Sequence, residues 1–126
     1  MLTKFSVGQI WKYRTRPTEE ESRITIVRVD ADDPEFGNII HIYISDLNIP
    51  NREAPEGKTV YVGHMPYDED ALENSVTEMV SETKTLPDYQ DGYRLWKEAF
   101  DESQAGVFEI PVSQAIDFVQ ESISKK

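Results

Sequence analysis

The sequence contains no cysteine, so disulfide bonds, thiolate catalysis and zinc sites built on cysteine are excluded. It also has no run of 18 apolar residues that could span a membrane. The opening residues, MLTKFSVGQIW, lack the apolar stretch of a signal peptide. From these absences we expect a soluble protein of the cytoplasm with no membrane partner.

Glycine is scarce, at six residues in 126, and the glycines are scattered along the chain. The sequence contains neither of the glycine patterns that bind phosphate groups, GxGxxG and GxxxxGK[ST]. It also lacks the GxSxG motif of serine hydrolases. We therefore expect no cofactor. The missing motifs leave enzymatic activity open, with the balance toward a non-catalytic protein.

Negative charge dominates the residues that are present. The chain has 24 acidic and 13 basic residues, which gives a formal net charge of -11. The first 18 residues hold four basic residues and no acid, whereas residues 68–121 hold 14 acids against three bases. An acidic surface repels the phosphate backbone of nucleic acids and attracts basic proteins. The charge thus disfavours nucleic-acid binding and favours a basic protein partner.

A chain of this length suits one domain, here 1–126, with a strand-rich part at 5–66 and a helix-rich part at 67–126. Alternating or β-branched runs predict strands over 8–15, 22–30, 38–47 and 58–65, the last ended by Pro66. Apolar residues at helical spacing predict three helices: one over 68–82, one that begins in the LPDYQDG segment and ends at about 103, and one from 112 onward. A short strand is predicted between the last two helices, at 107–111.

This order, β-β-β-β-α-α-β-α, predicts an α+β domain. We expect a mainly antiparallel sheet or a small curved barrel, with helices packed on one face. In the second helix, Tyr89, Tyr93, Trp96 and Phe100 follow one another at spacings of 4, 3 and 4. A stripe of four large aromatic residues is rare on a soluble surface, so we expect it to dock the helix on the sheet.

The segment GHMPYDEDALENS places His64 shortly before Asp68 and Glu69. Acids at this point are typical of a helix N-terminus, which explains them without a functional role. An alternative interpretation adds His41, the other histidine of the chain. If paired strands bring both imidazoles to one face, they and Asp68 or Glu69 would resemble a two-histidine, one-carboxylate metal site. These four residues are the only catalytic candidates, for a small metal-assisted hydrolase.

The segment WKYRTRP alternates aromatic and basic residues. Trp11 and Tyr13 share one face of the predicted strand, and Arg14 and Arg16 share the other. In proteins that bind single-stranded nucleic acids, bases stack on aromatic rings while cations hold the phosphates. A groove here would bind a small anionic ligand or a single strand. The structural alternative places the aromatic residues in the core and pairs the cations with acids of the next turn.

Three longer segments resemble a family of small uncharacterised bacterial proteins: VGQIWKYRTRPTEEES, GHMPYDEDALENSVTE and LPDYQDGYRLWKEAF...AGVFEIPVSQAIDFV. The resemblance covers nearly the whole chain and implies a bacterial protein, but it brings no activity with it. The GQIW opening is also similar to the first strand of the SH3-like barrel in toxins of the MazF/PemK kind. The acidic helical half departs from that pattern, so ribonuclease activity is not carried over.

Three functions follow from these observations as hypotheses. The leading one is a non-catalytic interaction module whose acidic helical face meets a basic partner, as immunity and antitoxin proteins do. The second is the metal-assisted hydrolase, and the third is the anionic-ligand or single-strand site at Trp11 and Tyr13. The sequence leaves the oligomeric state open.

Overall fold

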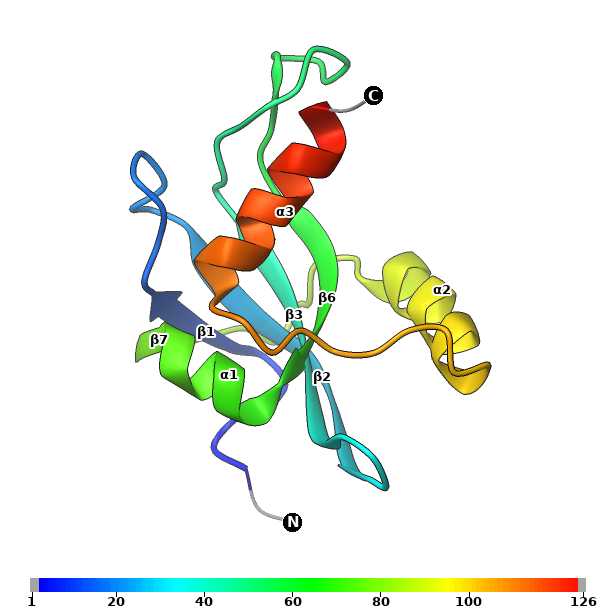
Figure 1. The fold of residues 1–126 in the computed structure, drawn as a ribbon. Helices are drawn as coiled ribbons and strands as arrows, with labels where there is room; N and C mark the ends of the chain where they lie inside the picture. The colour runs from blue at the N-terminus through cyan, green and yellow to red at the C-terminus, as the bar shows by residue number, and fades with distance from the viewer. Residues whose placement is uncertain (1–2, 125–126) are drawn as a thin grey trace.

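The alternating runs of the chain form an open five-stranded sheet in the structure, a computed structural model that describes residues 3–124 (Figure 1). The strands lie in the order β6-β3-β2-β1-β7, and each is antiparallel to its neighbours. A separate two-stranded ribbon pairs β4 with β5. The bounds of the strands are β1 (Gln9–Tyr13), β2 (Arg23–Asp33), β3 (Gly37–Ser45), β4 (Ile49–Pro50), β5 (Lys58–Thr59), β6 (Val62–Asp68) and β7 (Val76–Glu82).

Three helices complete the fold of the described residues: α1 (Glu69–Ser75), α2 (Gln90–Asp101) and α3 (Val112–Ser124). The α+β class expected from the sequence is confirmed, with a sheet that stays open instead of closing into a barrel. The helices α1 and α3 cover the core face of this sheet, whereas α2 lies on the opposite face (Figure 1). The expectation that the helices pack on one face is therefore wrong for α2, whose aromatic residues pack on His41 instead of on the core. Among the described residues, no helix has the length and apolar character needed to cross a membrane.

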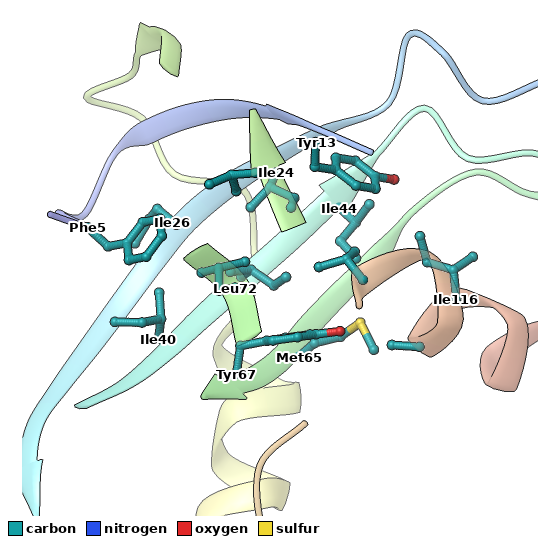
Figure 2. Packing of buried hydrophobic residues seen from close by; sticks show 14 of the residues in the cluster. Phe5, Tyr13, Ile24, Ile26, Ile40, Ile44, Met65, Tyr67, Leu72 and Ile116 are labelled. Carbon is teal, nitrogen blue, oxygen red and sulfur yellow. The ribbon is translucent and has the colours of Figure 1, made fainter. Parts of the chain in front are cut away.

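The hydrophobic core lies between the sheet and the helices α1 and α3. From β3 it receives Ile40, Ile42 and Ile44, all fully buried, because alternate side chains of a strand point to the same face. Leu72 of α1 and Ile116 of α3 belong to the same buried cluster (Figure 2). Burying such side chains contributes about 1.5–3 kcal/mol each, so this face supplies most of the hydrophobic stabilisation.

A β-bulge in β2 decides which face its polar residues occupy. Ile24 and Ile26 point into the core, and the pairing with β3 then shifts by one residue, so that Arg28 lies opposite His41. Without the shift, Arg28 and Asp30 would continue the core-facing series. With it, both lie on the outer face of the sheet, which is the face of His41 and of α2.

The helix predicted over 68–82 is wrong in its second half. The helix ends at Ser75, and the following residues form β7, which pairs with β1. All residues of β7 after Val76 are exposed, including Met79 and Val80, so the helical spacing of its apolar residues did not mark a buried stripe. The β-branched sequence VTEMVSE suits a strand, and it covers what would otherwise be the free edge of β1.

Two predicted strands also differ from the structure. The strand predicted over 107–111 is reduced to a single parallel bridge between Phe108 and Tyr67. The strand predicted over 58–65 is divided into β5 and β6, and β6 continues through Pro66 to Asp68. Proline is tolerated there because β6 is an edge strand of the sheet.

Candidate functional site

Polar side chains from three adjacent strands meet on the outer face of the sheet, underneath α2. Nε2 of His41 lies 2.9 Å from Oδ2 of Asp30, and Nδ1 of His41 lies 2.8 Å from Nε2 of His64. Asp30 comes from β2, His41 from β3 and His64 from β6, so the three form a diagonal across the sheet. We call these three residues the histidine array.

The carboxylate of Asp30 fixes where the protons of the array lie. An ionised carboxylate only accepts hydrogen bonds, so His41 carries its proton on Nε2 and uses Nδ1 as an acceptor. His64 then donates from Nε2, and its own Nδ1 keeps a free lone pair. Among the described residues this nitrogen has no hydrogen-bond partner, and His64 lines a cavity of about 270 Å³ beside Gly63 and Asp88.

The surroundings hold both histidines in the neutral form. Burial raises the pKa of Asp30, but the hydrogen bond from Arg28 and attraction to His41 when that ring is protonated outweigh it, and the pKa lies below its usual value. Burial lowers the pKa of His41, although Asp30 opposes the shift. Burial, and then repulsion from His41 when that ring is protonated, lower the pKa of His64 to about 4. At neutral pH the array therefore carries one negative charge and two neutral rings.

Aromatic side chains of α2 cover the array. The ring of His41 lies 5.0 Å from that of Tyr93 and 4.9 Å from that of Trp96, edge-on in both cases. The hydroxyl of Tyr93 donates to Oδ2 of Asp30 at 3.2 Å, and the guanidinium of Arg28 lies 4.3 Å from the Tyr93 ring. The aromatic stripe of α2 thus faces the sheet, as the spacing of its residues predicts.

The contact between α2 and the sheet is close but small. Gly92 lies against His64, where a Cβ atom on residue 92 would come within 2.9 Å of the His64 Cβ. At the other end, Nε1 of Trp96 donates to the carbonyl oxygen of Gly106 at 2.8 Å. None of the 12 residues of α2 is fully buried. The helix is therefore held by ring edges and a few hydrogen bonds, without a core of its own.

A larger cavity, of about 680 Å³, opens at the C-terminal end of α2, and we call it the Phe36–Phe100 cavity. The two rings lie 5.7 Å apart, Phe36 on the turn between β2 and β3 and Phe100 on α2. Asp33, Glu35 and Asp101 also line it, and no described lysine or arginine does. The last turn of α2 contains no basic residue, so the partial negative charge of the helix end adds to that of the carboxylates.

The structure brings together two of the four residues considered for a metal site. His41 and His64 meet on one face, but both ring nitrogens of His41 are occupied by hydrogen bonds. The carboxylate of Asp68 caps the first turn of α1, and Glu69 lies 3.4 Å from the side-chain amide of Asn38. Within residues 3–124, no group of three or more histidine, cysteine or acidic residues is placed to hold a metal ion.

The two aromatic residues of the WKYRTRP segment have structural partners. Trp11 is partly buried and packs edge-on against Phe5, with their ring centroids 5.4 Å apart. Tyr13 is buried, and its hydroxyl shares a hydrogen bond of 2.7 Å with Ser22. Burial raises the pKa of Tyr13 to about 12. Both residues therefore contribute to the core side of β1 instead of forming an open stacking surface.

The two arginines of the same segment are also engaged within the chain. Arg14 donates to a backbone carbonyl near the end of α1. Arg16 forms two hydrogen bonds with the carboxylate of Glu19, of 2.8 and 2.7 Å, and a third with Asp117 at 3.0 Å. The side chain of Glu19 is fully buried, which makes this ion pair part of the structure.

Sequence reasoning missed Asp30 and the Phe36–Phe100 cavity. Asp30 is the last residue of the strand predicted over 22–30, and simple alternation along that strand would point it to the wrong face. The cavity had a local signal, because the turn sequence DDPEFG places Phe36 among acids where a polar residue is usual. The cavity's other wall, Phe100, was recognised only as part of the aromatic stripe.

No family model matches this chain, and neither a curated protein nor a solved structure is similar enough to be matched to it. The resemblance to small bacterial proteins stays a prediction.

Proposed function

We propose that this protein is a non-catalytic interaction module that binds a basic segment of a partner protein at the Phe36–Phe100 cavity. The observation that supports the proposal is the lining of that cavity: two aromatic rings stand beside three carboxylates. Lysine and arginine side chains are attracted by the faces of aromatic rings and by carboxylates together. A cationic side chain fits this combination better than any anionic or apolar group.

The chain itself gives an example of such a contact. The ammonium of Lys97 lies 5.3 Å from the centroid of the Phe100 ring and 2.9 Å from Oδ1 of Asp101. Asp33 and Glu35, on the other wall of the cavity, have no ion pair among the described residues, and Oδ2 of Asp33 accepts hydrogen bonds from the backbone N–H groups of Glu35 and Phe36 at 3.0 Å. The carboxylate of Glu35 and Oδ1 of Asp33 therefore remain available to a cation supplied by a partner.

The basic residues of the N-terminal part do not offer a matching site for an anion. Lys4 lies 3.8 Å from a carboxylate oxygen of Glu73, and Lys12 lies 3.5 Å from one of Glu78. Together with the contacts of Arg14 and Arg16 described above, these contacts give each of the four cations a partner within the protein. A basic partner is thus favoured over an anionic ligand, in keeping with the net charge of -11.

A metal-assisted hydrolase has less support. Its two histidines are hydrogen-bonded to each other, and the carboxylates at 68 and 69 make other contacts.

Binding of a fluorescent lysine-rich peptide, with a neutral peptide of the same length as reference, tests the proposal. Glu35→Gln removes one negative charge from the cavity, and Glu109→Gln removes one from an exposed position outside it. We expect Glu35→Gln to weaken binding about two- to fivefold, the effect of one exposed charge pair, and Glu109→Gln to change it much less. Equal affinities of the two variants, or equal binding of the neutral peptide, would reject the cavity as the site.

A further inference from the structure

The histidine array and the Phe36–Phe100 cavity share one structural element, the helix α2. Tyr93 and Trp96 hold this helix over His41, and Phe100 of the same helix supplies one wall of the cavity. The other wall, Phe36, belongs to the turn between β2 and β3 and does not depend on α2. A change at the array that releases α2 would therefore separate the two walls.

We infer that the histidine array is an acid-sensitive latch, which keeps α2 on the sheet at neutral pH and releases it when both imidazoles become protonated. The release of α2 would open the Phe36–Phe100 cavity and end partner binding, and only this second step rests on the proposed function. The helix is suited to such a role because it has no fully buried residue. Its detachment leaves the core between the sheet, α1 and α3 intact.

The geometry allows the array to accept one proton but opposes a second. A single proton on His41 would lie between Nδ1 and His64, with Nε2–H still bonded to Asp30. A second proton would place two cationic rings 5.0 Å apart, and both nitrogens at the 2.8 Å contact would then be donors. The close approach of α2 at Gly92, where an added Cβ atom would lie 2.9 Å from the His64 Cβ, leaves little space on this side for His64 to move away from His41.

The charged and titratable groups around the array do not remove this conflict. Two acids, Asp88 and Asp91, line the cavity beside His64, but Asp88 accepts a hydrogen bond from the backbone of Gln90 and Asp91 pairs with Arg94. From β2, Asp30 can offset one positive charge, but Arg28 beside it adds another. From α2, Lys97 also opposes the protonation of His41. Tyr93 donates to Asp30 and is neutral throughout the acid range. A proton reaches the array through the cavity of about 270 Å³ that His64 lines.

The sign of the pH dependence follows from the lowered pKa of His64. An imidazole free in solution has a pKa of about 6.5, whereas His64 in the docked structure has a pKa of about 4. The released state therefore binds more protons between these values, and acid favours it. At pH 5 this one group shifts the equilibrium toward release about twentyfold relative to pH 7. Docking is fully present above about pH 6.5 and is lost toward pH 4.

Tryptophan fluorescence tests the latch without any partner. In a Trp11→Phe background, Trp96 is the only tryptophan and reports the contact with His41. We expect its emission to change between about pH 6.5 and pH 4.5 while amide resonances of the core strand β3 stay those of the folded protein. His64→Gln should move this transition at least about one pH unit lower, since the variant lacks one titrating group. The control variant Glu98→Gln, on the exposed side of α2, should leave it in place.

Amide resonances of α2 cover the case in which His64→Gln does not fold. In the wild-type protein they should report release of α2 over the same pH range as the fluorescence. An α2 that stays docked to pH 4.5, or a transition that the folded His64→Gln variant shares unchanged, would overturn the latch.

Binding of the lysine-rich peptide separates the latch from the proposed function. With both correct, acidification to about pH 5 should weaken peptide binding about tenfold or more in the wild type and clearly less in His64→Gln. This comparison cancels any other effect of acid on binding that both proteins share. Release of α2 without any peptide binding at neutral pH supports the latch and rejects the proposed function. Peptide binding with α2 docked at acid pH rejects the latch alone.

Discussion

Gly92 of α2 lies so close to His64 of β6 that a methyl group on residue 92 would be 2.9 Å from the His64 Cβ. Glycine inside a helix normally costs about 1 kcal/mol relative to alanine, and from the sequence it weakens the helix prediction here. The structure explains why residue 92 is a glycine, because the histidine array lies directly under this point of the helix. The approach of α2 to the sheet depends on the missing side chain.

Gly92→Ala should therefore destabilise the docked helix although it improves helix propensity. The new methyl group meets a Cβ atom that is fixed to the backbone of β6, so α2 has to move outward, at a cost of about 1–3 kcal/mol. Thermal unfolding of the variant, together with the fluorescence of Trp96, measures this effect. A peptide of residues 87–104 is the control, and there the same substitution should raise the helical content. A variant protein that gains stability would show that the contact with His64 is not constraining.

Tyr67→Phe and Tyr13→Phe should have opposite effects on stability. The hydroxyl of Tyr67 is buried and has no hydrogen-bond partner among the described residues, whereas that of Tyr13 is bonded to Ser22 at 2.7 Å. Removing an unsatisfied buried hydroxyl is neutral or stabilising by up to about 1 kcal/mol, and removing a satisfied one costs about 1 kcal/mol. Urea unfolding of the two variants gives the comparison. A larger loss for Tyr67→Phe than for Tyr13→Phe would mean that Tyr67 has a partner in solution.

Arg16→Met should strongly destabilise the protein. The replacement leaves the carboxylate of Glu19 buried without its cation, and breaking a buried ion pair in this way costs about 3–5 kcal/mol. Arg94→Met is the matched control, because Arg94 pairs with Asp91 on the exposed side of α2 and such pairs contribute about 0–1 kcal/mol. The measurement is again urea unfolding. Similar stabilities of the two variants would return Arg16 to the candidates for anion binding.

Much of the fold could be predicted from local patterns. The strand over NIIHIYIS has four isoleucines in eight positions, and it appears in the structure within one or two residues of its expected bounds. The terminal helix begins at Val112 as expected. In the segment VTEMVSE the apolar residues fit the helical period as well as a strand. There the pairing with β1, which is a tertiary contact, decided the outcome.

The candidate site could be predicted only in part, for a similar reason. The meeting of His41 and His64 could be stated as a condition, namely that their strands pair with both rings on one face. The participation of Asp30 depends on the bulge after Ile26, which nothing in the local sequence announces. That α2 lies opposite α1 and α3 depends on the path of the chain between β7 and α2. These are properties of the assembled sheet rather than of any one segment.

The central claim, that a basic partner binds at the Phe36–Phe100 cavity, is tested most directly by mapping a lysine-rich peptide onto the protein by nuclear magnetic resonance. Amide shifts at neutral pH and low salt locate the peptide, since charge-driven binding is strongest there. We expect the largest shifts at residues 33–36 and 100–106, with saturation as peptide is added. Shifts confined to the acids of α1 and α3, or no saturable shift around the cavity, would contradict the account.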